Sequence, residues 1–459
     1  MTDTQARVVC LEKRRHHFTF PSVRKLLRHE GPFRHRNVRL YAWFSVLYNA
    51  RAYYPVFAIF FFALGLDVTQ FFLMNMVWAA AIFLFEVPSG ALADTIGRKR
   101  LVVFASALMV AEMALLLCAP QNGGWVLLTM CILNRLLSGT SEASASGADQ
   151  SLAYDTLFEH GDEELWDDVL ATTMRWRSIG FFVAMIIGAL VYDPKFLNWL
   201  LGTDFDQATT LRLPVAIVFV QSLFCLAVSL RMREPVREGV EPCPLGERCA
   251  SAIKLTLRTA AWVLKTPLAF RIVLGTLLID AVVRNFVTIN SEYYRLIELP
   301  EFTFGFIGAI TAGLGFFVPT IAKGMLNRYS PITNLALIAA MVLGCLVVLI
   351  PAVPYFVLPI VILFTAFGFL EFLSSSTLHK LADSSQRATV LSVKGLGCNL
   401  GYGSLALGYA GVLGWFETEE GSPGGALLRA LPWQALYFAI TMALFLAVFW
   451  RPQRPKRPR

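Results

Sequence analysis

Residues 86–100 read EVPSGALADTIGRKR, and this stretch decides how the rest of the chain is interpreted. The apolar segment before it ends through Pro88 and Gly90 in a turn with three consecutive basic residues at positions 98–100. A second apolar segment begins directly after the turn. Since Lys and Arg concentrate in the cytoplasmic loops of membrane proteins, the stretch indicates a short cytoplasmic turn between two membrane spans.

The composition of the chain is that of a membrane protein. Of its 459 residues, 56% are hydrophobic and 16% are charged, and the mean hydropathy is +0.58. Soluble domains carry about 25% charged residues, so too little charge is present to cover a soluble particle of this size. We therefore expect an integral membrane protein, whose net charge of +8 faces the cytoplasm and lipid headgroups rather than nucleic acid.

Twelve apolar segments follow one another along the chain, and a transmembrane helix needs about 20 residues. They cover residues 40–65, 68–92, 101–120, 125–157, 172–192, 211–231, 269–290, 303–326, 332–351, 354–379, 388–414 and 432–450. Lys and Arg are abundant in every second gap and rare in the alternate gaps. Because basic loops stay in the cytoplasm, we expect an all-α protein with twelve transmembrane helices and both termini cytoplasmic.

A basic, proline-containing connection after the sixth apolar segment divides the chain. Residues 249–265 (CASAIKLTLRTAAWVLK) have the pattern of an amphipathic helix at a membrane surface, with Lys254, Arg258 and Lys265 on the polar face. The predicted organisation is a basic cytoplasmic tail (1–38), a six-helix bundle (39–231), a cytoplasmic linker with the amphipathic helix (232–267), a second six-helix bundle (268–450) and a basic cytoplasmic tail (451–459).

The turn also resembles a family signature. Gly90, Asp94, Gly97 and residues 98–100 fit the pattern G-x-x-x-D-x-x-G-R-[KR]-[KR] of the loop between the second and third helices of the major facilitator superfamily. The resemblance covers about residues 39–450 and is nearest to a bacterial group similar to drug antiporters. It implies two six-helix bundles and secondary transport by alternating access, without assigning a substrate.

The resemblance also implies a conformational gate. In the family, the Asp of this loop interacts with the start of helix eleven, and the contact breaks when the protein opens inward. Helix eleven is expected to start near Arg387 in this chain, so Asp94 should lie against that end. The implied gate residues are Gly90, Asp94, Gly97, Arg98, Lys99 and Arg387.

Ionisable residues inside apolar segments are costly and therefore mark functional sites. Spans one, four, seven and ten, which line the central cavity in the superfamily, each carry at least one such residue. The candidate substrate-binding residues are Arg51, Asn49 and Tyr54 in span one, Arg135 in span four, Asp280, Arg284 and Asn285 in span seven, and Glu371 in span ten.

These charges have an alternative interpretation as internal salt bridges that fix the helix register. Asp280 and Arg284 are spaced i,i+4 and can pair on one helix face. Arg51 and Arg135 need an acidic partner or an anionic ligand, because an unpaired buried charge costs several kcal/mol. The sequence leaves both interpretations open.

Proton coupling needs a carboxyl group whose affinity for protons changes with its surroundings. Glu142 shares a helix face with Arg135 in span four, and Glu371 and Glu112 are further candidates. Arg135-x-x-x-Gly139 resembles an element of proton-coupled drug antiporters, in which the Arg is linked to proton movement. Span five has Gly180 and Gly188 but lacks the Pro-containing element of those antiporters, so the chain departs from their usual pattern.

The sequence favours a proton-coupled transporter, an exporter, for a small amphipathic or charged organic molecule. One alternative is a specific carrier, for uptake or uniport, of an anionic or zwitterionic metabolite, and another is a receptor or scaffold without transport. We expect no enzyme activity, catalytic residue, metal or cofactor, since no P-loop or nucleophile elbow is present. The expected partners are the small-molecule substrate, protons and lipid, in a monomer of the bacterial cytoplasmic (inner) membrane.

Overall fold

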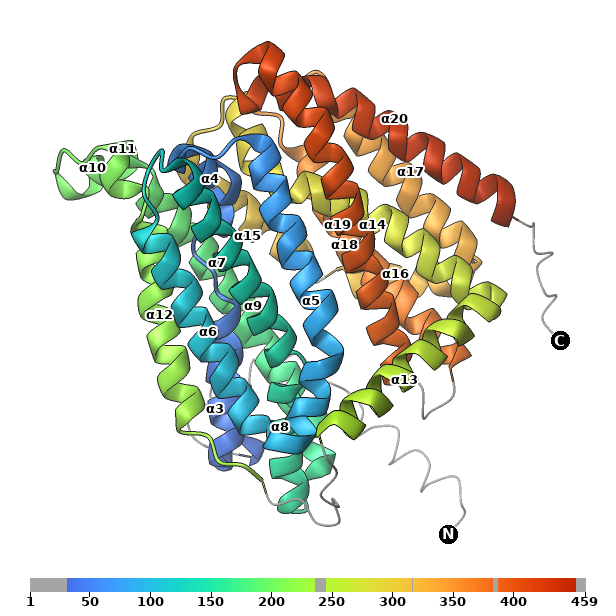
Figure 1. Ribbon diagram of the computed structural model, residues 1–459. Helices are drawn as coiled ribbons and strands as arrows, with labels where there is room; N and C mark the ends of the chain where they lie inside the picture. The colour runs from blue at the N-terminus through green and yellow to red at the C-terminus, as the bar shows by residue number, and fades with distance from the viewer. Residues whose placement is uncertain (1–30, 236–244, 316, 383–386, 451–459) are drawn as a thin grey trace, which may run out of the picture.

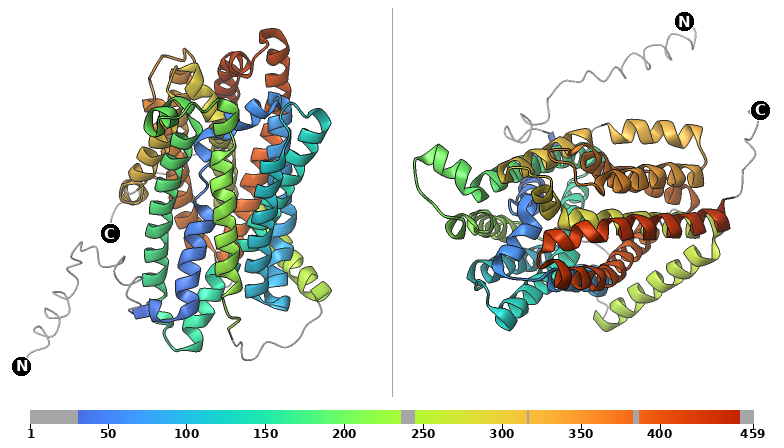
Figure 2. Two further views of the ribbon diagram at one scale, coloured as in Figure 1. Left: turned by 90° about the vertical axis from the view of Figure 1, so that its left-hand side faces the viewer. Right: turned by 90° about the horizontal axis from the view of Figure 1, so that it is seen from above.

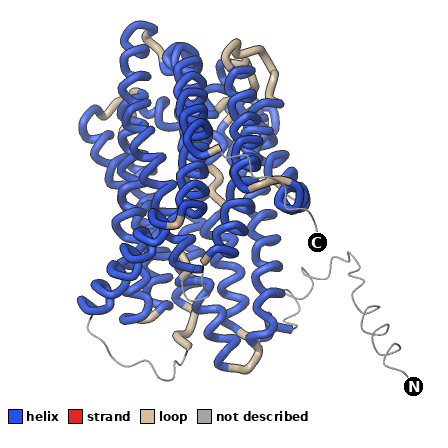
Figure 3. The backbone as a smooth tube through the Cα atoms, turned by 90° about the vertical axis from the view of Figure 1, so that its right-hand side faces the viewer, coloured by secondary structure: helices blue, strands red, loops and turns tan. Residues whose placement is uncertain are grey.

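The computed structural model describes residues 31–235, 245–315, 317–382 and 387–450. This part of the chain consists of helices and their connections (Figure 3). The tails at 1–30 and 451–459, and residues 236–244 of the predicted linker, lie outside the described residues.

The first half of the chain contains the helices that precede the linker. Their bounds are η1 (Gly31–Arg34), α3 (Arg36–Asn49), η2 (Tyr54–Val56), α4 (Phe57–Leu64), α5 (Val68–Ile96), α6 (Arg98–Cys118), α7 (Gly124–Ala145), α8 (Ala148–Glu159), η3 (Glu163–Leu165), α9 (Trp166–Tyr192), α10 (Pro194–Leu201), α11 (Gln207–Thr210) and α12 (Leu213–Leu230).

The second half begins with the helix of the linker. Its elements are α13 (Leu245–Lys265), α14 (Pro267–Leu296), η4 (Glu301–Thr303), α15 (Phe304–Leu314), α16 (Val318–Arg328), α17 (Pro331–Leu349), α18 (Leu358–Leu381), α19 (Arg387–Glu420) and α20 (Pro423–Phe449).

The described helices include nine segments that are long and apolar enough to cross a membrane. A tenth is added if α15 and α16, which meet at a bend of 45°, form one span. Helices α7 and α19 occupy the predicted fourth and eleventh spans but contain many small and polar residues, which lower their hydropathy. The chain is thus an all-helical, multi-pass membrane protein, and the number of twelve crossings remains a prediction.

Besides the eighth predicted span, which is divided into α15 and α16, two predicted spans are interrupted helices. The first is broken between α3 and α4, so Arg51 lies in a short non-helical stretch. The fourth is divided into α7 and α8 at Gly147, whose φ of 73° is a conformation that favours glycine. Backbone breaks of this kind leave polar groups without helical partners, so other side chains have to satisfy them.

The helices form two groups that lie side by side, α3–α12 on the left and α14 and α16–α20 on the right of Figure 1, while α15 is drawn beside α9 in the left-hand part of the picture. The view from above in Figure 2 shows the same division. Across the boundary between the halves, α5 packs against α19, α4 against α14, and α9 against α15. Helix α13 runs along the lower end of Figure 1 and contacts α5, α14 and α19.

The turn at 86–100 is a packed joint rather than a free loop. Gly97, with φ 104°, separates α5 from α6. The Glu234 carboxylate accepts hydrogen bonds from the backbone N–H groups of Arg98 and Lys99, each at 2.8 Å, and so caps the N-terminus of α6. Arg98 pairs with Asp155 of α8 at 2.5 Å, so the joint connects α6, α8 and the chain that follows α12.

Candidate functional site

A cavity of about 290 Å³ lies between the two halves of the molecule. Its described lining comes from both halves: Tyr54, Pro55, Phe57, Asn75, Trp78, Arg135, Ser138, Phe181 and Met185 from the first, and Arg284, Val287, Thr288, Asn290, Tyr294, Phe304, Gly308, Phe364 and Tyr402 from the second. We call it the central cavity. Three of the predicted binding residues, Tyr54, Arg135 and Arg284, belong to this lining.

Arg135 is held in the wall of the central cavity by aromatic rings. The side chain is on α7 and is 4% exposed, and its guanidinium carbon lies 5.0 Å from the ring centre of Phe57 and 5.5 Å from that of Phe61. Its Nε donates a hydrogen bond to Asn134 Oδ1 at 3.1 Å. The Nη2 atom is buried without a hydrogen-bond partner among the described residues, so the guanidinium has an unsatisfied donor.

Arg284 of α14 lies on the wall that the central cavity shares with a second cavity. Its Nη2 donates to Asp280 Oδ1 at 3.0 Å, and its Nη1 donates to Asn399 Oδ1 at 3.0 Å. The guanidinium carbon lies 5.4 Å from the ring centre of Tyr402. The charge of Arg284 is therefore already balanced by Asp280, unlike that of Arg135.

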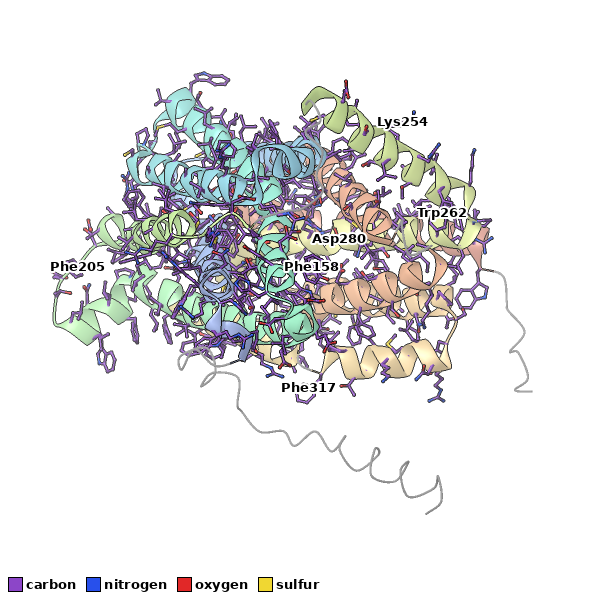
Figure 4. The ribbon with its side chains drawn as sticks, turned by 90° about the horizontal axis from the view of Figure 1, so that it is seen from below. Phe158, Phe205, Lys254, Trp262, Asp280 and Phe317 are labelled. Carbon is purple, nitrogen blue, oxygen red and sulfur yellow. The ribbon has the colours of Figure 1, made fainter. Side chains whose placement is uncertain are left out.

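The second cavity has a volume of about 250 Å³ and lies within the C-terminal half. Asp280, Arg284, Glu371 and Lys394 are among the residues that line it. Lys394 Nζ is 2.7 Å from Glu371 Oε2 and donates a hydrogen bond to it. Figure 4 shows Asp280 near the middle of the molecule, with Lys254 of α13 at its edge. The structure thus places Asp280 and Glu371 beside the central cavity rather than on its described lining.

The halves are joined at the upper end of Figure 1. Every hydrogen bond between the halves that connects described residues lies there: the backbone N–H of Ala58 donates to Ser291 Oγ at 3.0 Å, and that of Val68 to Glu417 Oε2 at 2.9 Å. The remaining bonds come from Ile59, Thr69, Arg295 and Phe302. These contacts hold the two halves together at this end.

Comparison with solved structures gives similar folds over almost the whole chain. The crystal structure of nucleoside transporter NupG superposes with a TM-score of 0.68 at 14% identity, and 91% of this chain and 99% of that one are covered. A bacterial homologue of the human lysosomal transporter Spinster, inward-facing and unoccupied, gives 0.63 at 13% identity, covering 95% and 100%. A D-xylose–proton symporter gives 0.59 at 14% identity, covering 91% and 95%.

The chain has the fold of these membrane transporters. A comparison with models of protein families and a comparison with curated protein sequences each gave no match.

Arg51 and Glu112 form an ion pair inside the N-terminal half of the transporter fold. Both are buried, at 6% and 0% exposure, and neither belongs to the described lining of the central cavity. The Arg51 guanidinium also lies 5.5 Å from the ring centre of Tyr48. The charge of Arg51 is thus balanced by Glu112 on α6. From the sequence alone, its partner could have been either an acidic side chain or an anionic ligand.

Neighbouring helices supply hydrogen bonds and space for the backbone at the break in the first helix. Gln221 of α12 donates hydrogen bonds to the carbonyl oxygens of Leu47 at 2.5 Å and of Ala50 at 2.7 Å. Gly188 of α9 lies against the break, because a Cβ at this position would be 1.6 Å from the Ala52 carbonyl oxygen. The fold therefore depends here on Gln221, which bonds to the backbone at the break, and on Gly188, which leaves room for the broken segment.

Two of the predicted binding residues, both with amide side chains, donate hydrogen bonds to the backbone of their own helices. Asn49 Nδ2 donates to the Ser45 carbonyl oxygen and Asn285 Nδ2 to that of Ala281, both at 2.8 Å. Neither belongs to the described lining of either cavity. Both bonds run to the residue four positions earlier, so each amide is bonded to the backbone of its own helix.

Glu142 on α7 differs from the other predicted carboxylates. It is exposed, and no ion pair involves it among the described residues. The charges that act on it electrostatically include Arg51, Arg135 and Arg284. Glu112 and Glu371, in contrast, are paired with Arg51 and Lys394, so Glu142 is the unpaired acid of the predicted set.

The predicted gate is described only in part. The side chains of Asp94 and Arg387 lie outside the described residues. A Cβ at Gly90 would meet no described atom within 4 Å, so Gly90 marks no close helix contact in this part of the structure. Gly97, Arg98 and Lys99 form the joint with Glu234.

Sequence reasoning missed several residues of these sites. Lys394 lies inside the predicted eleventh span, and the rule that singled out Arg135 applies equally to it. Trp78, Phe181, Tyr294 and Phe304 of the central cavity carried no such signal, because aromatic residues occur on every face of these apolar segments.

Proposed function

We propose that this protein is a secondary active transporter that moves a small organic molecule through the central cavity by alternating access. The observation that carries the proposal is a cavity lined by both halves, whose hydrogen bonds to each other, among described residues, lie at one end. Separation of that end, with closure of the other, exposes the cavity to the opposite side of the membrane. The fold shared with solved transporters supports this proposal.

The proposal includes coupling to protons, with Glu142 as the carboxyl group that takes up and releases them. Glu112 and Glu371 are each already bound to a cation, Arg51 and Lys394. Glu142 is unpaired among the described residues and lies in the electrostatic field of Arg135 and Arg284. A change in the position or pairing of either arginine therefore changes how readily Glu142 holds a proton.

The proposed direction is export, and the support for it is the resemblance of Arg135-x-x-x-Gly139 to the element of proton-coupled antiporters. If both termini are cytoplasmic, the joined upper end faces the outside and the structure is inward-facing, from which an exporter loads its substrate. The proposed setting is a monomer in a bacterial cytoplasmic membrane.

A specific carrier for an anionic metabolite is the second candidate. The observation that favours it is the unpartnered Nη2 of Arg135 in the cavity wall. Such a carrier differs from the exporter in direction and coupling but uses the same cavity. A receptor or scaffold would need neither Glu142 nor a moving boundary between the halves.

The experiment is proton flux across proteoliposomes that contain a pH-sensitive dye, with pooled candidate substrates added to one side. A substrate-induced pH change that disappears in Glu142→Gln supports proton-coupled transport. Uptake of a substrate without a pH change supports the uncoupled carrier and removes the proton step. Folded protein that transports no member of the pool, while a reference transporter does so in the same vesicles, contradicts the transport proposal for that pool.

A further inference from the structure

The central cavity has a wall chemistry that selects one class of ligand. We propose that it binds an organic monoanion, a molecule with one carboxylate or similar anionic group attached to a flat aromatic or apolar body of one or two rings. This inference rests on the proposed function, since it names the substrate class of the same cavity. Charge, ring contacts and volume each contribute to it.

The charge of the described lining is positive. It contains Arg135 and Arg284, and no acidic side chain belongs to the described lining. Asp280 pairs with Arg284 from the second cavity at 2.8 Å, whereas Arg135 has no ion-pair partner among the described residues and interacts with the charge of Glu142 at longer range. One arginine without a direct partner fits a ligand with a single negative charge, whereas it would repel a cationic ligand.

The position of Arg135 fits the recognition of an anion. The side chain is 4% exposed, and contacts with Phe57, Phe61 and Asn134 hold its guanidinium in one orientation. Its Nη2 has no hydrogen-bond partner among the described residues. A buried N–H without a partner is unfavourable, and an anionic oxygen relieves that cost with a charge-assisted hydrogen bond.

The body of the ligand is defined by rings from both halves. In the N-terminal half, the ring centres of Tyr54 and Phe181 are 6.4 Å apart, and in the C-terminal half those of Tyr294 and Phe304 are 4.9 Å apart. Between the halves, the ring centres of Trp78 and Tyr402 are 6.4 Å apart. Aromatic side chains pack favourably against flat apolar groups, so the lining selects a ring-bearing body over a sugar, which needs many hydrogen bonds.

The volume limits the size of that body. The cavity measures about 290 Å³, which is at the lower limit of the range of about 300–1,000 Å³ found for sites that bind small molecules. One or two rings and an acid group fit this volume. The site thus combines a single anion position with a small, ring-lined compartment.

The test measures binding of three matched probes to the purified full chain in detergent: 2-naphthoate, its neutral amide 2-naphthamide, and the cationic 2-naphthylmethylamine. We expect 2-naphthoate to raise the Tm and to give a measurable Kd by calorimetry, and the other two to bind at least about tenfold more weakly. Removal of a charge-assisted hydrogen bond typically changes Kd by this factor or more.

Variants of Arg135 locate the binding site. Arg135→Gln should weaken 2-naphthoate at least about tenfold, and Arg135→Lys should retain part of the affinity because the charge remains. Arg175→Gln is the matched control, since Arg175 is an exposed arginine of α9 outside the described lining. The control should bind 2-naphthoate as the wild type does. Each variant has to elute as a monodisperse protein with the far-ultraviolet spectrum of the wild type.

Three outcomes overturn the inference: equal binding of the amide or the amine, unchanged binding in Arg135→Gln, or binding of no probe by the folded wild type. Flux of the same probes into proteoliposomes separates this inference from the proposed function. Transport of the amide or amine without preference for the acid overturns the anion site and leaves the transporter standing. Binding of 2-naphthoate that depends on Arg135, without transport of any probe, supports the anion site and contradicts transport of this class.

Discussion

Arg51, in the break of the first helix, and Glu112, inside α6, are bound to each other within the N-terminal half. Asn134, the neighbour of Arg135, donates a hydrogen bond to the Glu112 carbonyl oxygen at 2.7 Å. The ion pair and the cavity arginine are therefore parts of one connected arrangement. The ion pair holds the break of the first helix against α6. The Asn134 hydrogen bond holds α7 against α6 next to Arg135.

Neutralising one partner of this pair should destabilise the protein. Arg51→Gln leaves the Glu112 charge buried without a cation, and the loss of one partner of a buried pair typically costs about 3–5 kcal/mol. We expect a lower Tm in detergent for Arg51→Gln and for Glu112→Gln, with a smaller loss in the double variant. If Arg51→Gln keeps the wild-type Tm but no longer binds 2-naphthoate, Arg51 contacts the ligand and this structural role is wrong.

Gly188→Ala should also be destabilising, because its Cβ would be placed 1.6 Å from the Ala52 carbonyl oxygen. That overlap forces α9 away from the break in the first helix. Gly344→Ala in α17 is the matched control, since no described atom lies within 4 Å of its Cβ position, and Ala is favoured over Gly inside helices by about 1 kcal/mol. Thermal unfolding of both variants should give a lower Tm for Gly188→Ala and an unchanged or higher one for Gly344→Ala.

Asp162, at the lower end of the molecule in Figure 1, should make the thermal stability of the protein depend on pH. It lies outside the membrane spans and accepts hydrogen bonds from His35 at 2.6 Å and Arg34 at 2.5 Å, and these contacts hold the pKa of Asp162 below its ordinary value. Its contribution is complete above the pKa of the unfolded chain, about 3.9, and is lost as the pH falls through the lower pKa of the folded chain. The Tm of the wild type should therefore fall more steeply below about pH 4 than that of Asp162→Asn. Parallel curves for the two proteins would show that Asp162 contributes nothing.

Glu234→Gln tests the joint at the 86–100 turn. The carboxylate of Glu234 accepts two backbone N–H groups at the N-terminus of α6, and loss of a helix cap costs about 0.5–2 kcal/mol. We expect a lower Tm for this variant, whereas Glu159→Gln, at an exposed position of α8, should leave the Tm unchanged. Equal values for the two variants would remove the capping role.

The sequence predicted the helical membrane fold because long apolar segments and alternating basic gaps are local patterns. It also singled out Arg135 and Arg284, which lie on the described lining of the central cavity, because a charge inside an apolar segment is visible without a structure. It could not identify the partner of Arg51, because Glu112 is 61 positions away and the break in the first helix has no strong local signal. Glu234 was missed for a similar reason, since its role depends on a distant helix end.

The shared wall formed by Arg284 links the contents of the two cavities. Its guanidinium belongs to both compartments and is bound to Asp280 on one side. A ligand that drew this group into the central cavity would weaken its bond to Asp280. By thermodynamic reciprocity, an event in the second cavity that loosens the same bond would change the affinity of the central cavity for that ligand by the same factor. One arginine thus couples the occupancy of one compartment to the charge balance of the other.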